Sequence, residues 1–106
     1  MTAADGLESA FHHPNRLAVV AFLSGCAEAE FRTVREECGL SEPALSKLAA
    51  AFEAAGHVAV RKGYVGKRPR TWLSLTPAGR ARLAAHLAAL QEIAARNAGR
   101  AADLEQ

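Results

Sequence analysis

The strongest constraint on the fold is a connection of only three residues, Gly39–Ser41, between two predicted short helices. In the first helix, which runs from Phe31 to Cys38, the side chains at 31, 34 and 38 recur at i, i+3 and i+7 and form one apolar stripe. Gly39 then stands where a left-handed helix cap favours glycine, and Ser41 is a strong N-cap for the next helix. Two short helices joined by so tight a turn predict a helix-turn-helix arrangement.

The second helix of this pair is predicted to begin after Ser41 and to end at Gly56. Its opposite face is small and polar, with Ser46, Lys47 and Ala50. The buried stripe is expected to consist of Leu45, Leu48, Ala49 and Phe52.

Beyond this helix the apolar residues alternate, which predicts strands in place of helix. Val58 and Val60 mark the first strand, and residues 71–75 alternate again. Pro69 has no N–H to donate to a neighbouring strand, so we expect no central strand there. The two runs predict a β-hairpin whose loop is basic, VGKRPR, at residues 65–70.

A helix is also predicted on each side of this central part. Pro14 suits the first turn of a helix that continues to Ser24. Thr76 is a candidate N-cap for a last helix, which is expected to end near Asn97 because Gly99 interrupts it.

The 106 residues are therefore predicted to form one domain, mainly α with a small β-hairpin. The expected order is helix, helix-turn-helix, two-stranded hairpin and long C-terminal helix. We expect this domain to occupy residues 12–98, between a flexible N-terminal segment, 1–11, and a frayed tail, 99–106.

The positive charge of the chain is concentrated in one segment. Between Ala54 and Gln91 there are seven Lys and Arg residues and no Asp or Glu, whereas the remainder carries six cations and all eleven acids. A basic surface of this kind is typical of proteins that bind a polyanion. The alternative is a solvated basic face without a partner.

Three stretches resemble the winged helix-turn-helix regulators, in the neighbourhood of the MarR-like and ArsR-like families and closest to a group of small stand-alone winged-helix domains. They are HHPNRLAVVAFL from His12, LSEPALSKLAAAFEAAGHV from Leu40, and VGKRPRTWLSLTPAGR from Val65. The resemblance implies a winged helix fold and a DNA-binding regulator of transcription, most simply a repressor. The sequence departs from the family pattern in the second helix, where Lys47 is the only cation. A cytoplasmic location is expected on separate grounds, because no signal peptide is recognisable and the two cysteines form no disulfide framework.

In a helix-turn-helix the second helix enters the major groove, and the basic hairpin is expected to reach phosphates or the minor groove. The alternative for the helix is that Ser46 and Lys47 merely face water. Trp72 is expected to point outward and to pack on the stems of neighbouring cations, and the alternative is that it lies against sugar-phosphate. The predicted DNA-binding residues are Ser41, Pro43, Ala44, Ser46, Lys47, Lys62, Lys67, Arg68 and Arg70.

The last helix carries an apolar seam at spacings of four, three and four residues, as in a coiled coil. We expect a homodimer that matches a palindromic operator, with half-sites about one DNA turn apart. The alternative is that this helix packs only on the first helix of its own chain. The predicted interface residues are Leu83, Leu87, Leu90, Ile93 and Ala94.

The sequence shows no pattern for catalysis, a metal or a cofactor, and we expect no enzyme. The four histidines lack the spacing of metal ligands, and the two cysteines form no disulfide framework. No signal peptide is recognisable, and no apolar run approaches the ~18 residues of a membrane span. Two other functions stay open: a winged helix that binds a protein partner, and a sensor that holds an unknown effector in the dimer cleft or uses Cys26 for redox chemistry.

Overall fold

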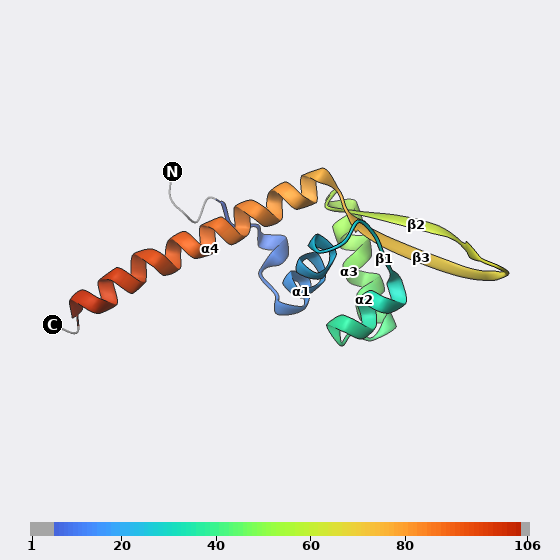
Figure 1. Cartoon of the computed structure of the whole chain (residues 1–106), viewed down its shortest axis with the longest axis horizontal. Helices are drawn as coiled ribbons and strands as arrows, with labels where there is room; N and C mark the ends of the chain where they lie inside the picture. Colours follow the sequence, from blue (N-terminus) through green and yellow to red (C-terminus); the bar gives the residue numbers. More distant parts are fainter. Residues whose placement is uncertain (1–5, 105–106) are drawn as a thin grey trace.

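In the computed structural model, which describes residues 6–104, the start of each α-helix and the end of α2 agree with the caps that the sequence predicts, and Figure 1 shows the arrangement of the helices. Helix α1 spans Pro14–Ser24, α2 spans Phe31–Cys38, and α3 spans Glu42–Ala54. The Ser41 side chain accepts a hydrogen bond from the Ala44 N–H at 3.3 Å. Gly39 has a φ of 67°, and the Leu40 N–H donates to the Arg35 carbonyl at 2.9 Å. The predicted helix-turn-helix is therefore confirmed.

The sheet has three strands in the order β1-β3-β2, one more than the sequence predicted. Strands β2, Val58–Val65, and β3, Arg68–Leu75, form the predicted hairpin, which we call the wing. The third strand, β1, has only two residues, Ala29–Glu30, and pairs with Trp72 and Leu73. So short a strand is defined by its partner and not by any pattern of its own.

Strand β3 is the central strand, so the expectation from Pro69 was wrong. The reason is local, because β1 reaches only Trp72 and Leu73 and leaves β3 with a free edge at Pro69. The missing N–H therefore removes no hydrogen bond to a neighbouring strand on that side.

The loop at the tip of the wing is shorter than predicted. It consists of Gly66 and Lys67 alone, so Arg68 and Arg70 lie in strand β3 and not in a loop. Gly66 has a φ of 61°, and no described non-glycine residue has a positive φ. A positive φ at the first loop residue only is the pattern of a type II′ turn, whose twist matches that of the strands.

The folded body also extends further toward the N-terminus than residue 12. A short 3-10 helix, η2, spans Ser9–Phe11, and Phe11 is only 1% exposed. Its ring meets Phe52 edge-on, with 6.1 Å between centroids. The Glu8 N–H donates to the Nδ1 atom of His86 at 3.0 Å. The expected flexible segment therefore does not include Phe11, and its first five residues lie outside the described part of the chain.

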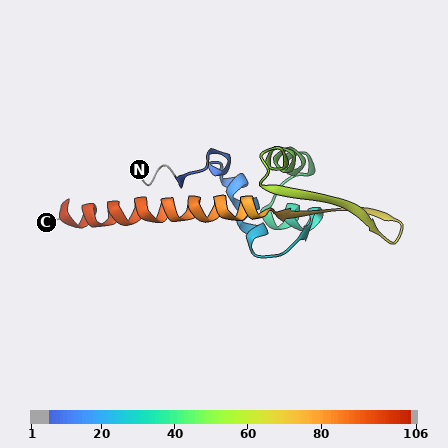
Figure 2. The same ribbon diagram turned by 90° about the horizontal axis from the view of Figure 1, so that it is seen from above.

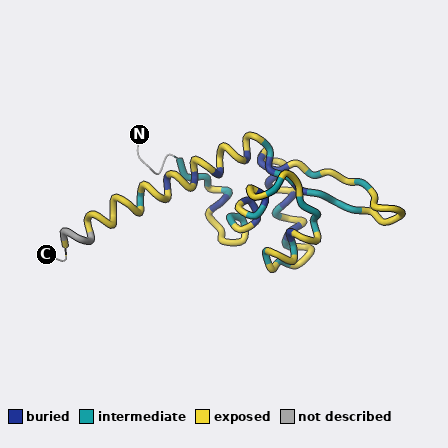
Figure 3. Tube along the Cα trace, in the orientation of Figure 1, coloured by how far each residue is buried: buried dark blue, intermediate teal, exposed yellow. Residues whose placement is uncertain are grey.

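The core lies where α1, α2, α3 and the sheet meet (Figure 3). The buried residues of η2, the first three helices and the strands are Phe11, Val19, Val20, Leu23, Val34, Leu45, Ala49, Phe52, Val58, Leu73 and Leu75, and α4 adds Leu83.

Helix α4 spans Pro77–Leu104 and so continues through Gly99, where the sequence predicted its end. One glycine costs a helix only about 1 kcal/mol, which neighbouring residues with high helix propensity offset. The Thr76 hydroxyl caps the helix by accepting from the Gly79 N–H at 2.9 Å. The wing and the distal part of α4 project from opposite ends of the body, so the molecule measures 66 × 26 × 21 Å (Figures 1 and 2).

Candidate nucleic-acid interface

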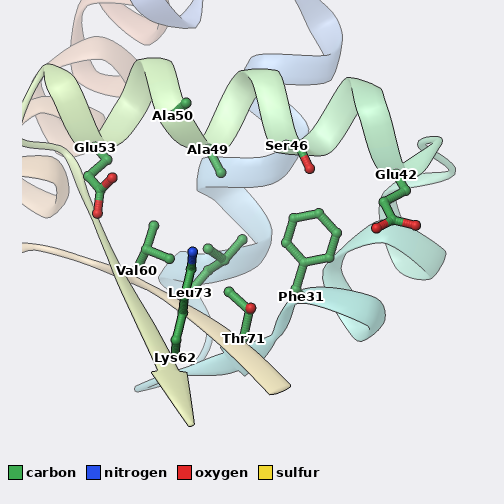
Figure 4. Close-up of a pocket in the computed structure, with 10 residues that line it drawn as sticks. All are labelled: Phe31, Glu42, Ser46, Ala49, Ala50, Glu53, Val60, Lys62, Thr71 and Leu73. Carbon is green, nitrogen blue, oxygen red and sulfur yellow. The ribbon is translucent and has the colours of Figure 1, made fainter. Parts of the chain in front are cut away.

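Helix α3 and the wing form the two walls of an open groove of about 340 Å³. Side chains alternate along a strand, so every second residue of β2 and β3 faces α3. Ser46 and Lys62 point into the groove from opposite walls (Figure 4). The lining residues are Phe31, Glu42, Ser46, Ala49, Ala50, Glu53, Val60, Lys62, Thr71 and Leu73.

The predicted contacts on α3 lie on its solvent side. Ser46 and Lys47 are exposed in the middle of the helix, and Ser41 and Pro43 are exposed at its N-terminus, with Ala44 half-buried beside them. The free N–H groups of a helix N-terminus suit a phosphate. The same surface also carries two acids that line the groove, Glu42 and Glu53.

Three wing cations have no acidic partner among the side chains described, those of residues 6–100 and 104: Lys62, Lys67 and Arg68. All three are exposed. They stand at different places, because Lys62 faces the groove, Lys67 forms the tip, and Arg68 begins strand β3. These are the positions from which a wing can reach the backbone of a duplex.

Arg61 is held by Glu28, a contact that the sequence did not predict. Its Nε and one terminal nitrogen donate to the two carboxylate oxygens of Glu28, at 2.9 and 2.6 Å. The guanidinium also lies over the ring of Trp72, 4.0 Å from its centroid. The hydrogen bond from Arg61 lowers the pKa of Glu28 below its usual value. Trp72 therefore packs against a neighbouring cation as predicted, through the guanidinium of Arg61.

Arg70 is also paired with an acid. Its Nε atom lies 2.6 Å from a carboxylate oxygen of Glu30, the second residue of β1. About a third of each of these two side chains is exposed, 33% for Arg70 and 35% for Glu30. The predicted contact between Arg70 and DNA is not tested by the structure, and the ion pair with Glu30 competes with it.

Arg80 belongs to the basic segment of the sequence, but its side chain binds backbone carbonyls of its own chain. Its two terminal nitrogens donate to the carbonyls of Ser24 and Cys26, at 3.1 and 2.9 Å. The last carbonyls of a helix lack partners within the helix, so Arg80 closes the C-terminal end of α1. The basic segment therefore divides into cations that face solvent and cations that hold the structure together.

The predicted interface residues on α4 divide in a similar way. Leu83 is only 4% exposed and belongs to the core of its own chain, whereas Leu87 and Leu90 are 41% and 40% exposed. Ile93 is half-buried and Ala94 exposed. The surface left for a partner therefore begins after Leu83.

Both cysteines and two of the four histidines that the sequence analysis considered lie in or near the core. Both cysteines are half-buried, and burial, with a smaller contribution from Glu37, raises the pKa of the Cys38 thiol. His57 and His86 are buried against Phe11. Among the side chains that the structure describes, in residues 6–100 and 104, no three His, Cys, Asp or Glu are grouped to hold a metal ion. No described helix is long and apolar enough to cross a membrane.

Solved structures with the same arrangement of helices, strands and wing are known. A transcriptional regulator homologue from Pyrococcus horikoshii OT3 is 24% identical with a TM-score of 0.76, over 84% of this chain and 89% of that one. YusO from Bacillus subtilis is 22% identical with a TM-score of 0.72, over 90% and 67%. The transcriptional repressor BigR from Xylella fastidiosa is 23% identical with a TM-score of 0.63, over 79% and 80%. These similarities show a shared fold.

Among curated proteins no sequence matches this chain. A family model described as a winged helix DNA-binding domain matches residues 15–94, which include α1 except for its first residue, α2, α3, the wing and most of α4. That match covers well over half of the 106 residues. The chain therefore belongs to the winged helix DNA-binding domain family.

Proposed function

We propose that this protein is a transcriptional regulator that binds duplex DNA and represses by occupying a palindromic operator as a homodimer. The observation that carries the proposal is the groove between α3 and the wing, since Ser46 and Lys62 stand on its two walls. A helix and a basic hairpin that flank one groove can contact the same face of a duplex. Membership of the winged helix DNA-binding domain family supports it independently.

Each wall contributes a different kind of contact. The N-terminal half of α3 enters the major groove, where Ser46 and Lys47 meet base edges and Pro43 and Ala44 meet thymine methyl groups. Ser41 and the first N–H groups of the helix bind a phosphate.

The wing supplies most of the electrostatic attraction. Lys62 and Lys67 bind phosphates, and Arg68 enters the minor groove, where a narrow A·T-rich segment attracts a guanidinium. Each neutralised phosphate releases counterions, so the affinity falls steeply with salt. Because Lys47 is the only cation of α3, the wing contributes more to affinity and α3 more to sequence preference.

The homodimer rests on the exposed part of α4. Leu87 and Leu90 are large apolar side chains that the body of their own chain leaves about 40% exposed. A two-fold axis through this part of α4 would present two α3 helices to two half-sites.

The test is a selection of bound sequences from a random duplex library, followed by titrations of the selected site and of a random duplex. We expect one palindromic site to be enriched, and Arg68→Ala to weaken binding to both duplexes. Lys47→Ala should instead reduce the preference between them. Failure to bind any duplex at low salt, together with binding to an acidic protein partner, would favour the protein-interaction alternative.

A further inference from the structure

The face of the sheet that points away from α3 carries an alternating set of acids and arginines. Residues Arg61, Trp72 and Glu30 are direct cross-strand neighbours on β2, β3 and β1. Side chains of direct neighbours lie on the same face. Arg70 is two residues from Trp72 along β3 and therefore shares this face.

The pair of Arg61 and Glu28 spans the whole sheet. Arg61 lies on β2, whereas Glu28 directly precedes β1, and β3 lies between these two strands. The guanidinium crosses the ring of Trp72 to reach the carboxylate. A Cβ on Gly63 would lie 3.2 Å from the Trp72 ring, so glycine at this position leaves room for the ring.

The second acid of the same segment holds the second arginine. Glu30 binds Arg70 at 2.6 Å, next to the two residues where β1 pairs with β3. The segment between α1 and α2 therefore supplies two carboxylates to two of the five cations of the wing. None of the ion pairs in the described part of the chain involves the other three, Lys62, Lys67 and Arg68.

We propose that Glu28 and Glu30 are positioning residues that keep Arg61 and Arg70 off the DNA, so that only Lys62, Lys67 and Arg68 of the wing bind it. This inference rests on the proposed function. An arginine that is already bidentate to a carboxylate, or paired with one at 2.6 Å, must lose that partner before it can bind a phosphate. A cation without an acidic partner breaks no ion pair when it binds a phosphate, and its binding releases the counterions of that phosphate directly.

The arrangement affects specificity more than the strength of binding. Cations that bind any phosphate raise affinity for every sequence equally. Withholding two of them lowers the affinity for random DNA, and contacts between α3 and bases then account for a larger share of the binding free energy.

The first experiment removes the charge of Glu30 and measures the affinity for a random duplex as a function of salt. Glu30→Gln frees Arg70, so the slope of log K against log salt should steepen by about 0.9, which corresponds to about eightfold tighter binding at about 0.1 M salt. Glu92→Gln is the matched control, because Glu92 pairs with Arg96 on α4, away from the wing. An equal effect of both variants would show that only net charge matters and would overturn the proposal.

A double-mutant cycle separates this role from a purely structural one. In the wild-type chain Arg70→Ala should change the affinity less than twofold, whereas in the Glu30→Gln chain it should reverse the gain. If Arg70→Ala weakened the wild-type chain as much as Arg68→Ala, Arg70 would bind DNA and the proposal would be wrong. Thermal unfolding shows whether each variant is folded.

Glu28 is tested through Trp72, the only tryptophan of the chain. Glu28→Gln should loosen Arg61 from the ring and change the fluorescence of Trp72, and the salt slope for random duplex should again steepen. Unchanged fluorescence and an unchanged slope would overturn the assignment of Glu28. A wild-type chain that binds no duplex at low salt refutes the proposed function, whereas a binding wild type with unaltered variants refutes this inference alone.

Discussion

At the scale of one residue, Phe11 explains why the folded body includes η2, a segment that the sequence pattern did not predict. The ring contacts Phe52, His57 and His86, which come from α3, the turn before β2, and α4. No helical or alternating pattern surrounds Phe11, so periodicity gave no reason to place it in the core. Its burial follows from tertiary contacts alone.

Replacement of Phe11 by Ala should lower the free energy of unfolding by about 3–5 kcal/mol, the usual cost of emptying a buried phenylalanine site. The same change at Phe22, which is only half-buried, should cost less. Urea unfolding followed by circular dichroism measures both. Equal losses would mean that Phe11 is not part of the core in solution.

Glu28 makes stability depend on pH in a defined direction. Because Arg61 lowers the pKa of Glu28 in the folded state below the usual 4.5, the pair stabilises the fold above that pH. The contribution is lost as the pH falls through the lowered pKa, where the carboxylate takes up a proton. The stability difference between the wild-type chain and Glu28→Gln should therefore shrink on acidification below about pH 4.5. Denaturant titrations over this range would contradict the prediction if the difference stayed constant.

At the scale of elements, the sequence predicted correctly those helix ends that local capping residues determine. Ser41 and Gly39 delimit two helices by capping alone, and the bounds of α2 and the start of α3 were correct. Strand β1 was missed because two residues carry no period. The predicted end of α4 near Asn97 was wrong because a single glycine, Gly99, costs the helix too little free energy to end it.

The candidate site was predictable in outline and not in its ion pairs. Ser46, Lys47 and Lys62 are exposed, as expected for polar residues on the solvent side of an amphipathic helix or strand. The partners of Arg61 and Arg70, however, lie more than thirty residues away in sequence. No local rule connects them, because the pairing depends on β1 joining the sheet.

The tip of the wing is sensitive to the backbone of one residue. Gly66→Ala should destabilise the wing by roughly 1–2 kcal/mol, because a Cβ disfavours a φ of 61°. Lys67→Ala leaves the turn intact and removes only a charge. Amide hydrogen exchange of β2 and β3 should accelerate in the first variant and not in the second, and equal exchange in both would contradict the turn assignment.

The whole molecule is elongated because its two projecting elements leave the body in opposite directions (Figure 2). Helix α4 has 28 residues, and the buried side chains among those described lie in its first part, at Leu83, His86 and Ala89. We place the second copy on the apolar surface at Leu87 and Leu90, which the described part of the chain leaves exposed.

A double change, Leu87→Glu with Leu90→Glu, should convert a dimer into a monomer in sedimentation at micromolar concentration, because it puts charge into an apolar contact. Ala88→Glu adds a charge on another side of α4 and should leave the dimer intact. A wild-type chain that sediments as a monomer would contradict the dimer, and the affinity for a palindrome should then equal that for a half-site.

Thr76 is the only residue between β3 and α4, and it is fastened on both sides. Its N–H and hydroxyl donate to the carbonyls of His57 and Gly56, and its hydroxyl also accepts from Gly79. The wing and α4 are therefore directly connected through Thr76, whose hydrogen bonds fix the connection at the edge of the body. A change in the direction of α4 at Thr76 would act on the wing and on the turn that follows α3, through the hydrogen bonds to Gly56 and His57.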